Sequence, residues 1–275
     1  MAKALPVLAH PPPVTHLGQP HRDEADNPTV VKRFWDQATA EPADGAYAIL
    51  LDGRPMHLPG GTTLRVPHPP LAHAIADEWQ RAGGGKGGEM SFADTPLTRL
   101  AGTAQHRVAA DPAPTADAIA RYAESDLLCY RAETPQALVR RQQAAWQPWL
   151  DWAEQRYGVK LLVTSGIVAI RQPREAIATL HAAVGGLDPW ALAALGVAVP
   201  ALGSVILGLA LAEQAVDPAA AHTLGALDEM FQAEQWGEDA EAAARRRAVA
   251  DDIAVAARLI ALTRAGPQPG APPGR

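Results

Sequence analysis

The chain has 275 residues, and 48% of them are hydrophobic, which is enough for one large domain or two smaller ones with real cores. Its formal net charge of −6 argues against a nucleic-acid-binding protein, because such proteins usually carry a basic surface. The single cysteine, Cys129, excludes an internal disulfide, and we interpret it as a small buried hydrophobic residue.

The two ends of the chain, 1–30 and 265–275, have the proline-rich, weakly hydrophobic composition of disordered tails. Residues 1–30 contain no apolar run of the length found in signal peptides. They also carry three acidic residues, whereas organelle transit peptides are rich in arginine and poor in acids. We therefore expect neither kind of targeting segment.

Residues 31–114 have the pattern of a small α+β domain. Two short apolar runs flank Asp52-Gly53 within 47–58, which predicts an antiparallel hairpin. A third strand is expected at 63–67, after Gly60-Gly61. Apolar residues at helical spacing predict helices over 71–79 and 96–108. In the first of these, Leu71, Ile75 and Trp79 form one stripe, so Trp79 is expected to be structural.

The glycine-rich segment 82–89 resembles a phosphate-binding loop only in composition. A Walker loop needs glycine where this chain has Gln80, and Ser or Thr where it has Gly87. The segment also follows a predicted helix rather than a strand. We predict a surface loop, no nucleotide binding and no cofactor.

Residues 115–264 have the pattern of a multihelical domain. Helix starts are indicated where a capping residue precedes proline, at Thr134-Pro135, Asp188-Pro189 and Asp217-Pro218, with an earlier case at Thr95-Pro96. Gly158 and Gly185 are natural helix ends. Residues 159–170 are the exception, because their β-branched run favours a hairpin or an extended link.

Residues 190–212 contain no charged residue and are long enough to cross a bilayer. Pro200 near their middle, several glycines and the absence of flanking Lys or Arg favour instead a buried helix, or two helices broken at Pro200. Ser204, Gly208 and Ala212 recur every four residues, which lets another backbone approach closely. We predict no stable membrane insertion.

The helix expected over 146–158 carries Trp146, Trp149 and Trp152. Trp146 lies on a core stripe and is expected to be structural, whereas Trp149 and Trp152 lie beside it and offer a second contact surface. Pro148 should kink or break this helix, since it removes a backbone hydrogen bond.

Residues 122–131 place Asp126 and Arg131 among apolar neighbours. A carboxylate there is a candidate general base, but an acid and an arginine this close more often pair to fix a chain crossing. We interpret both as structural.

Six carboxylates lie within 227–241, and Trp236-Gly237 is in their midst. Leu224, Leu227 and Phe231 should face the core and place Asp228 at the edge of the apolar face. Glu241 and Arg245 form an i,i+4 pair of small energy. No His or Cys joins these acids, so we predict no transition-metal site.

Seven segments in register resemble the family of assembly chaperones that act on the alpha subunit of the F-type ATP synthase head. They are KRFW (32–35), YAILLDGRP (47–55), Glu78-Trp79, PLTRLAGTA (96–104), YAESDLLCYR (122–131), WQPWLDWAEQRYGV (146–159) and LDEMFQAEQWGE (227–238). The resemblance runs from about residue 31 to about 262.

The resemblance implies an α+β domain followed by a helical domain, no catalysis, and a role in holding the free alpha subunit until assembly. It places the partner-binding surface on the acidic helix, at Asp228, Glu229, Glu234 and Trp236, and we expect Asp228 and Glu229 to be its centre. The family also occurs in mitochondria, but the acidic N-terminus here indicates a bacterial cytoplasmic member.

Two other classes of protein stay open. One is a hydrolase that uses Asp228, Glu229 or Glu234, which would need a pocket and a nucleophile or metal. The other is a membrane-associated assembly factor that uses residues 190–212.

Overall fold

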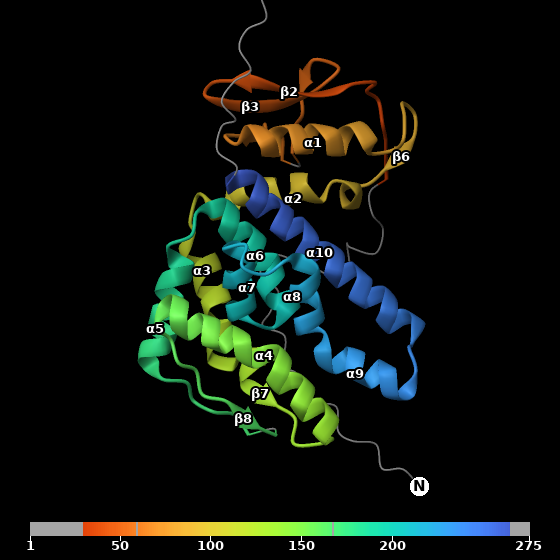
Figure 1. Cartoon of the computed structure of the whole chain (residues 1–275). Coiled ribbons are helices and arrows are strands. Elements are labelled where there is room, and N and C mark those ends of the chain that lie inside the picture. Colours follow the sequence, from red (N-terminus) through yellow and green to blue (C-terminus); the bar gives the residue numbers. More distant parts are fainter. Residues whose placement is uncertain (1–29, 59, 167, 265–275) are drawn as a thin grey trace, which may run out of the picture.

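The computed structural model describes residues 30–264 except 59 and 167, and it is an α+β structure with ten α-helices and small sheets in that range, antiparallel except for the parallel pair β7–β8 (Figure 1). The expected tails lie outside the described residues, apart from Val30. The strands are β1 (Val31–Lys32), β2 (Ala38–Ala43), β3 (Ala46–Leu51), β4 (Arg54–Pro55), β5 (Arg65–Val66), β6 (Glu89–Met90), β7 (Tyr130–Arg131) and β8 (Thr164–Ser165).

The main sheet is built around β3, which pairs antiparallel with β2, β4 and β5. The predicted hairpin at Asp52-Gly53 is confirmed as β3–β4, with Leu51 opposite Arg54. A second hairpin, β2–β3, turns at Asp44-Gly45, where both residues have positive φ, as in the turns that suit hairpins. Strand β2 was not expected, because its apolar positions are small alanines and it contains Pro42, a residue rarely found inside strands.

Helix α1 (Pro69–Arg81) covers one face of this sheet, and α2 (Pro96–Thr103) packs behind it. Helix α2 continues as a short π-helical turn, η2 (Ala104–Val108). In Figure 1, α1 lies beneath β2 and β3, and α2 lies beneath α1. A 3₁₀ turn, η1 (Phe92–Asp94), precedes α2.

The remaining helices form the larger body at the other end of the molecule. They are α3 (Ala113–Ala120), α4 (Gln136–Tyr157), α5 (Arg174–Gly185), α6 (Pro189–Leu202), α7 (Val205–Ala212), α8 (Pro218–Gly225), α9 (Leu227–Trp236) and α10 (Ala240–Arg264), with 3₁₀ turns η3 (Arg121–Ser125) and η4 (Leu127–Cys129).

The uncharged stretch 190–212 forms the centre of this body as two buried helices, α6 and α7. The break falls at Gly203, which has the left-handed conformation with φ of 64°, and not at Pro200, which lies inside α6. The prediction of a break at Pro200 was therefore wrong. Among the described residues, no helix combines the length and the hydropathy needed to cross a membrane.

Two expectations about α4 have different outcomes. Gly158 ends the helix in the left-handed conformation, as predicted. Pro148 does not break it, because α4 runs without interruption from Gln136 to Tyr157. Both Pro148 and Ala144, whose carbonyl loses its hydrogen-bond donor, are exposed, so water can replace the missing bond.

The helix caps follow the sequence only in part. Asp188 and Asp217 accept hydrogen bonds from the first N–H groups of α6 and α8, as expected. Thr95 and Thr134 do not cap α2 and α4. Instead, the Glu78 carboxylate accepts hydrogen bonds from the backbone N–H groups of Leu97 and Thr98, so a residue of α1 caps α2.

Candidate functional site

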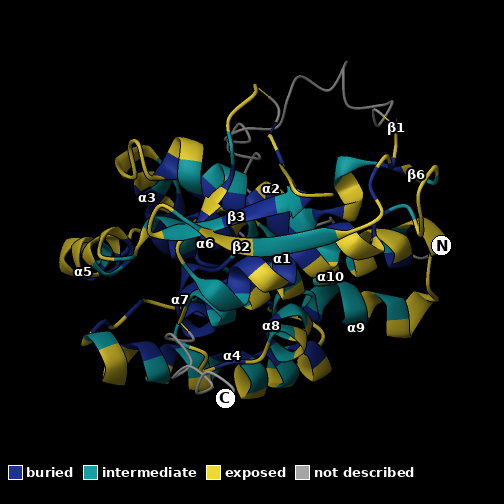
Figure 2. Cartoon of the chain, turned by 90° about the horizontal axis from the view of Figure 1, so that it is seen from above, coloured by how far each residue is buried: buried dark blue, intermediate teal, exposed yellow. Residues whose placement is uncertain are grey.

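The acidic segment folds as the short peripheral helix α9, which joins α8 at Ala226 and ends at Gly237, with φ of 94°. Only Leu227 and Phe231 are buried, so the helix makes one narrow apolar contact with the body. Figure 2 shows α9 at the rim, coloured mainly as intermediate and exposed. Polar contacts must therefore supply much of what fixes its position.

Asp228 faces the body. Its carboxylate accepts a hydrogen bond of 2.8 Å from Nε2 of Gln142 on α4, and the residue is half-buried. Gln142 is itself fully buried, and its Oε1 accepts a hydrogen bond of 2.7 Å from the backbone N–H of Ala132. The Gln142 amide thus connects α9 with the segment that follows β7.

Arg131 lies beneath this connection, 6% exposed, and donates to the backbone carbonyl of Gln142 over 2.6 Å. Its guanidinium stacks over the Trp146 ring, 5.1 Å from the centroid. Burial lowers the pKa of Arg131, while Cys129 and Asp228 act electrostatically in the opposite direction. The negative charge of Asp228 therefore compensates a buried cation.

Glu229 and Glu234 face arginines of neighbouring helices. Glu234 accepts hydrogen bonds of 2.6 and 2.8 Å from Arg141 on α4, and this contact lowers the pKa of the Glu234 carboxyl. Glu229 lies 3.8 Å from Arg246 and 3.9 Å from Arg245, both on α10. The expected Glu241–Arg245 pair is wrong, because Arg245 turns toward Glu229 across the α9–α10 corner.

Trp236 is the last residue of α9, and 71% of its surface is exposed. Gly237 ends the helix directly after it, so no following turn covers the indole. The structure thus separates the four predicted partner-binding residues: Asp228 points inward, Glu229 and Glu234 form ion pairs at the surface, and Trp236 is free of covering side chains.

The residues expected to be structural lie in the core. Trp79 is 6% exposed, and its indole N–H donates to Oγ1 of Thr98 over 2.8 Å. Trp146 is fully buried and donates to the carbonyl of Leu224, which ties α4 to α8. These contacts are those of packing residues.

Asp126 is also fully buried, but its partners differ from those expected. Its carboxylate accepts hydrogen bonds from the N–H groups of Leu128 and Ile206 and from the hydroxyl of Ser204. Arg131 binds Gln142 instead, so the predicted contact between this acid and this arginine is corrected. Burial raises the pKa of Asp126 to about 6, against the opposing effect of its hydrogen bonds.

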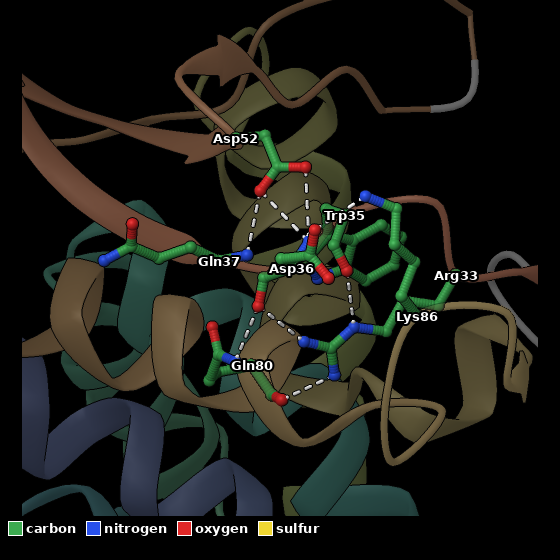
Figure 3. Close-up of polar contacts among 7 residues, drawn as sticks. All are labelled: Arg33, Trp35, Asp36, Gln37, Asp52, Gln80 and Lys86. Carbon is green, nitrogen blue, oxygen red and sulfur yellow. Dashed lines mark hydrogen bonds and ion pairs between the residues drawn. The ribbon is translucent and has the colours of Figure 1, made fainter.

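The glycine-rich loop belongs to a separate polar cluster at the start of the described chain (Figure 3). Lys86 reaches Asp36 over 2.6 Å, and this contact raises the pKa of Lys86. Arg33 is 3% exposed and donates to the carbonyls of Gln80 and Ala82, where α1 ends. The loop therefore anchors the incoming strand to α1, and its lysine already has an anionic partner.

Two residues that hold α9 in place, Gln142 and Arg141, were not predicted from the sequence. A signal was present for Gln142: it lies four residues before Trp146, and so on the same buried stripe of α4. A polar residue at such a position must find hydrogen-bond partners. No pattern in the sequence identified Arg141 as a residue that holds α9, because its partner Glu234 lies 93 residues away.

The described residues hold no group of three or more His, Cys, Asp or Glu side chains arranged to bind a metal. What the scaffold offers at α9 is a protruding tryptophan among surface carboxylates, held by polar contacts to a rigid helix. Such a surface is typical of a protein-binding module.

Comparisons with known proteins give the family. Residues 32–154 match the model of the ATP12 chaperone protein. The crystal structure of Atp12 from Paracoccus denitrificans is 39% identical, with a TM-score of 0.79, over 85% of this chain and 98% of that one. The mitochondrial protein atp12 of Schizosaccharomyces pombe is 27% identical over 219 residues, 76% of this chain and 75% of that one. The chain belongs to the ATP12 chaperone family.

Proposed function

We propose that the chain is an assembly chaperone of the proton-transporting F-type ATP synthase, and that it binds the unassembled alpha subunit and prevents its aggregation. Membership of the ATP12 chaperone family supports the chaperone class and a role in ATP synthase assembly. The alpha subunit is the client that the seven resembling sequence segments imply. The proposal involves no catalytic step, and we propose that the protein acts in a bacterial cytoplasm.

The exposure of Trp236 is the observation that supports a docking site at α9. Tryptophan is the residue type most enriched among the anchors of protein interfaces, because it removes a large apolar surface from water on binding. An indole that is 71% exposed has most of that surface still to bury. Glu234 and Glu238 flank it, but each already pairs with an arginine of this chain, Arg141 and Arg246, so the indole is the group left to make a new contact.

The centre of the proposed surface is therefore Glu234–Trp236, at the end of α9. Asp228 serves it indirectly, because its hydrogen bond from Gln142 and its charge near Arg131 hold the start of α9 against α4. Glu229 links the surface to α10 through Arg245 and Arg246. We propose Asp228 and Glu229 as residues that position the helix.

The test measures aggregation of purified alpha subunit by light scattering, with and without this protein. Trp236→Ala should fold normally and lose at least about 30-fold in client affinity, corresponding to about 2 kcal/mol for an interface anchor. The matched control is Phe34→Ala, since Phe34 is 63% exposed but lies on the N-terminal segment that pairs with β6. A folded Trp236→Ala protein that protects the client fully would place the docking surface elsewhere.

A further inference from the structure

A second surface with unburied apolar residues lies on the link between α4 and α5. Seven large hydrophobic side chains are exposed among the described residues, and three of them, Leu162, Val163 and Val168, fall within seven positions. They are 50%, 44% and 69% exposed. The segment passes through β8, which pairs with β7 over only two residues. This cluster of three large apolar side chains, left in water within one short segment, offers a surface that a partner can bury.

A cavity of about 50 Å³ lies beside Val163, between α4 and residues 160–163. Leu150 and Leu161, both buried, contribute apolar surface to it, and Asp151 and Glu154 of α4 contribute carboxylates. The volume is far below that of small-molecule pockets, so it can take only part of one side chain. An apolar interior with carboxylates beside it fits a lysine or arginine, whose stem is aliphatic and whose end is charged.

The cation that now lies near these carboxylates is weakly held. Nζ of Lys160 is 3.9 Å from Glu154, beyond hydrogen-bonding distance, and the Lys160 side chain is 80% exposed. Asp151 accepts a hydrogen bond of 2.8 Å from the side-chain amide of Gln147, which is a neutral donor. An incoming cation would therefore displace little.

The backbone next to the cluster limits how a partner can bind. The side-chain amide of Gln172 accepts from the N–H of Leu162 over 2.8 Å and donates to its carbonyl over 2.9 Å. Both backbone groups of Leu162 are thus occupied, so a partner cannot add a strand at this residue. Recognition must rest on the apolar side chains and the carboxylates.

We propose that Leu162, Val163 and Val168, together with Asp151 and Glu154, form a second binding surface for an extended polypeptide segment that carries a basic residue among apolar ones. The inference rests on the proposed chaperone function, since an unassembled client exposes such segments. Asp151 is ten residues beyond Arg141 on α4, about 15 Å along the helix axis, so one client can reach this surface and α9 together. Figure 1 shows β8 and α9 at the end of the molecule opposite β2 and β3.

The test uses a fluorescein-labelled synthetic decapeptide with one central lysine among valines and serines, and a matched peptide with glutamate at the centre. Fluorescence anisotropy should show binding of the lysine peptide and at least tenfold weaker binding of the glutamate peptide. The double variant Val163→Thr, Val168→Thr should lower affinity about tenfold, because each change removes an apolar methyl group from the contact. Asp151→Asn with Glu154→Gln should abolish the preference for lysine.

The matched control is Val30→Thr with Val31→Thr, since these valines are 54% and 44% exposed outside the cluster. This control and Trp236→Ala should both bind the peptide as the unchanged protein does. An equal loss in the Val30, Val31 control, or equal binding of the two peptides, would overturn the proposal. So would a concentration-dependent dimer that Val163→Thr abolishes, because a second copy would then be the occupant. None of these measurements uses the alpha subunit. A negative peptide result would therefore overturn the second binding surface without overturning the proposed function.

Discussion

Two tryptophans of this chain lie in opposite environments. Trp79 is 6% exposed, and its ring packs against Trp35 and Phe92, whereas Trp236 is 71% exposed. The same substitution at the two positions therefore separates packing from surface effects.

Trp79→Arg should give insoluble or unfolded protein. It removes a buried aromatic ring, leaves the Thr98 hydroxyl without the indole donor, and buries an unpaired charge. The cost is several kcal/mol, comparable to a total stability of about 5–15 kcal/mol. Trp236→Arg, the control, should keep the melting curve unchanged. Circular dichroism during thermal unfolding measures both, and an unchanged Trp79→Arg curve would contradict the structure.

Asp126 makes stability depend on pH in a direction opposite to that of most carboxylates. Its folded pKa of about 6 lies above the ordinary value of 3.8, so the folded protein holds a proton that the unfolded chain has released between these values. The free energy of unfolding should therefore fall as pH rises from about 4 to about 6, by up to about 3 kcal/mol from this group, and then stay level.

Asp126→Asn should remove this part of the pH dependence. The variant should also be less stable than the unchanged protein, because an amide N–H₂ must face one of the N–H groups of Leu128 and Ile206. Urea unfolding between pH 4 and pH 7 measures both effects. Other carboxylates titrate equally in the two proteins, so parallel curves would show that Asp126 does not titrate as described.

At the level of single elements, α9 is held to α4 by two contacts of different energy. The Arg141–Glu234 ion pair is partly exposed, so its contribution is about 0–1 kcal/mol. The Gln142 side chain is fully buried and satisfies both Asp228 and the Ala132 N–H. These contacts fix opposite ends of α9.

Gln142→Met keeps the volume but removes both hydrogen bonds, and it should lower the free energy of unfolding by about 2–4 kcal/mol. Glu234→Gln, the surface control, should lower it by less than about 1 kcal/mol. Hydrogen exchange should show faster exchange in α9 for Gln142→Met. Equal effects of the two changes would mean that the buried amide does not hold the helix.

The pair α6 and α7 depends on one glycine. A Cβ at Gly208 would lie 2.3 Å from Cγ2 of Val199, whereas a Cβ at Gly196 on the exposed side of α6 would meet only Thr115, at 3.8 Å. The small-residue stripe expected from the sequence thus lets α7 approach α6 closely.

Gly208→Ala should destabilise the protein by about 1–3 kcal/mol, because a buried methyl group forces neighbouring side chains apart. Gly196→Ala should be neutral or stabilising by up to about 1 kcal/mol, since alanine favours a helix. Denaturant midpoints of the two variants measure the difference, and a stabilised Gly208→Ala protein would contradict the close approach.

Across the whole molecule, α10 connects the two ends of the structure. It packs against α1 and α2 on the sheet side and against α6, α7 and α8 in the helical body. Its buried residues include Ile253, Ala256, Leu259 and Ile260, and they belong to the same hydrophobic core as residues of β3 and α1. The last helix of the chain therefore completes the packing of the first.

Unfolding should accordingly be one cooperative transition. Leu259→Ala should lower the free energy of unfolding by about 2–5 kcal/mol and shift the whole transition. Differential scanning calorimetry should give a single peak, and tryptophan fluorescence and far-ultraviolet circular dichroism should give coincident curves. Two separated transitions, with only one shifted by Leu259→Ala, would show that the sheet end and the helical end fold independently.

Features that depend on near neighbours could be predicted from the amino-acid sequence. The turn at Asp52-Gly53, the caps at Asp188 and Asp217, the end of α4 at Gly158 and the buried stripe around Trp146 all follow from residues within one or two turns. The seven segments in register also indicated the chaperone family, because a resemblance of this kind depends on residue types and their order alone.

Contacts between distant segments were decided by tertiary packing. Glu78 caps a helix that begins 18 residues later, Gln142 meets Asp228 across 86 residues, and Arg141 meets Glu234 across 93. A carboxylate has the same local pattern whether it faces water, a backbone N–H or a buried amide. Tertiary packing decides which of these partners lies beside it. For this reason the sequence could not show that Asp228 points inward while Trp236, on the same short helix, is exposed.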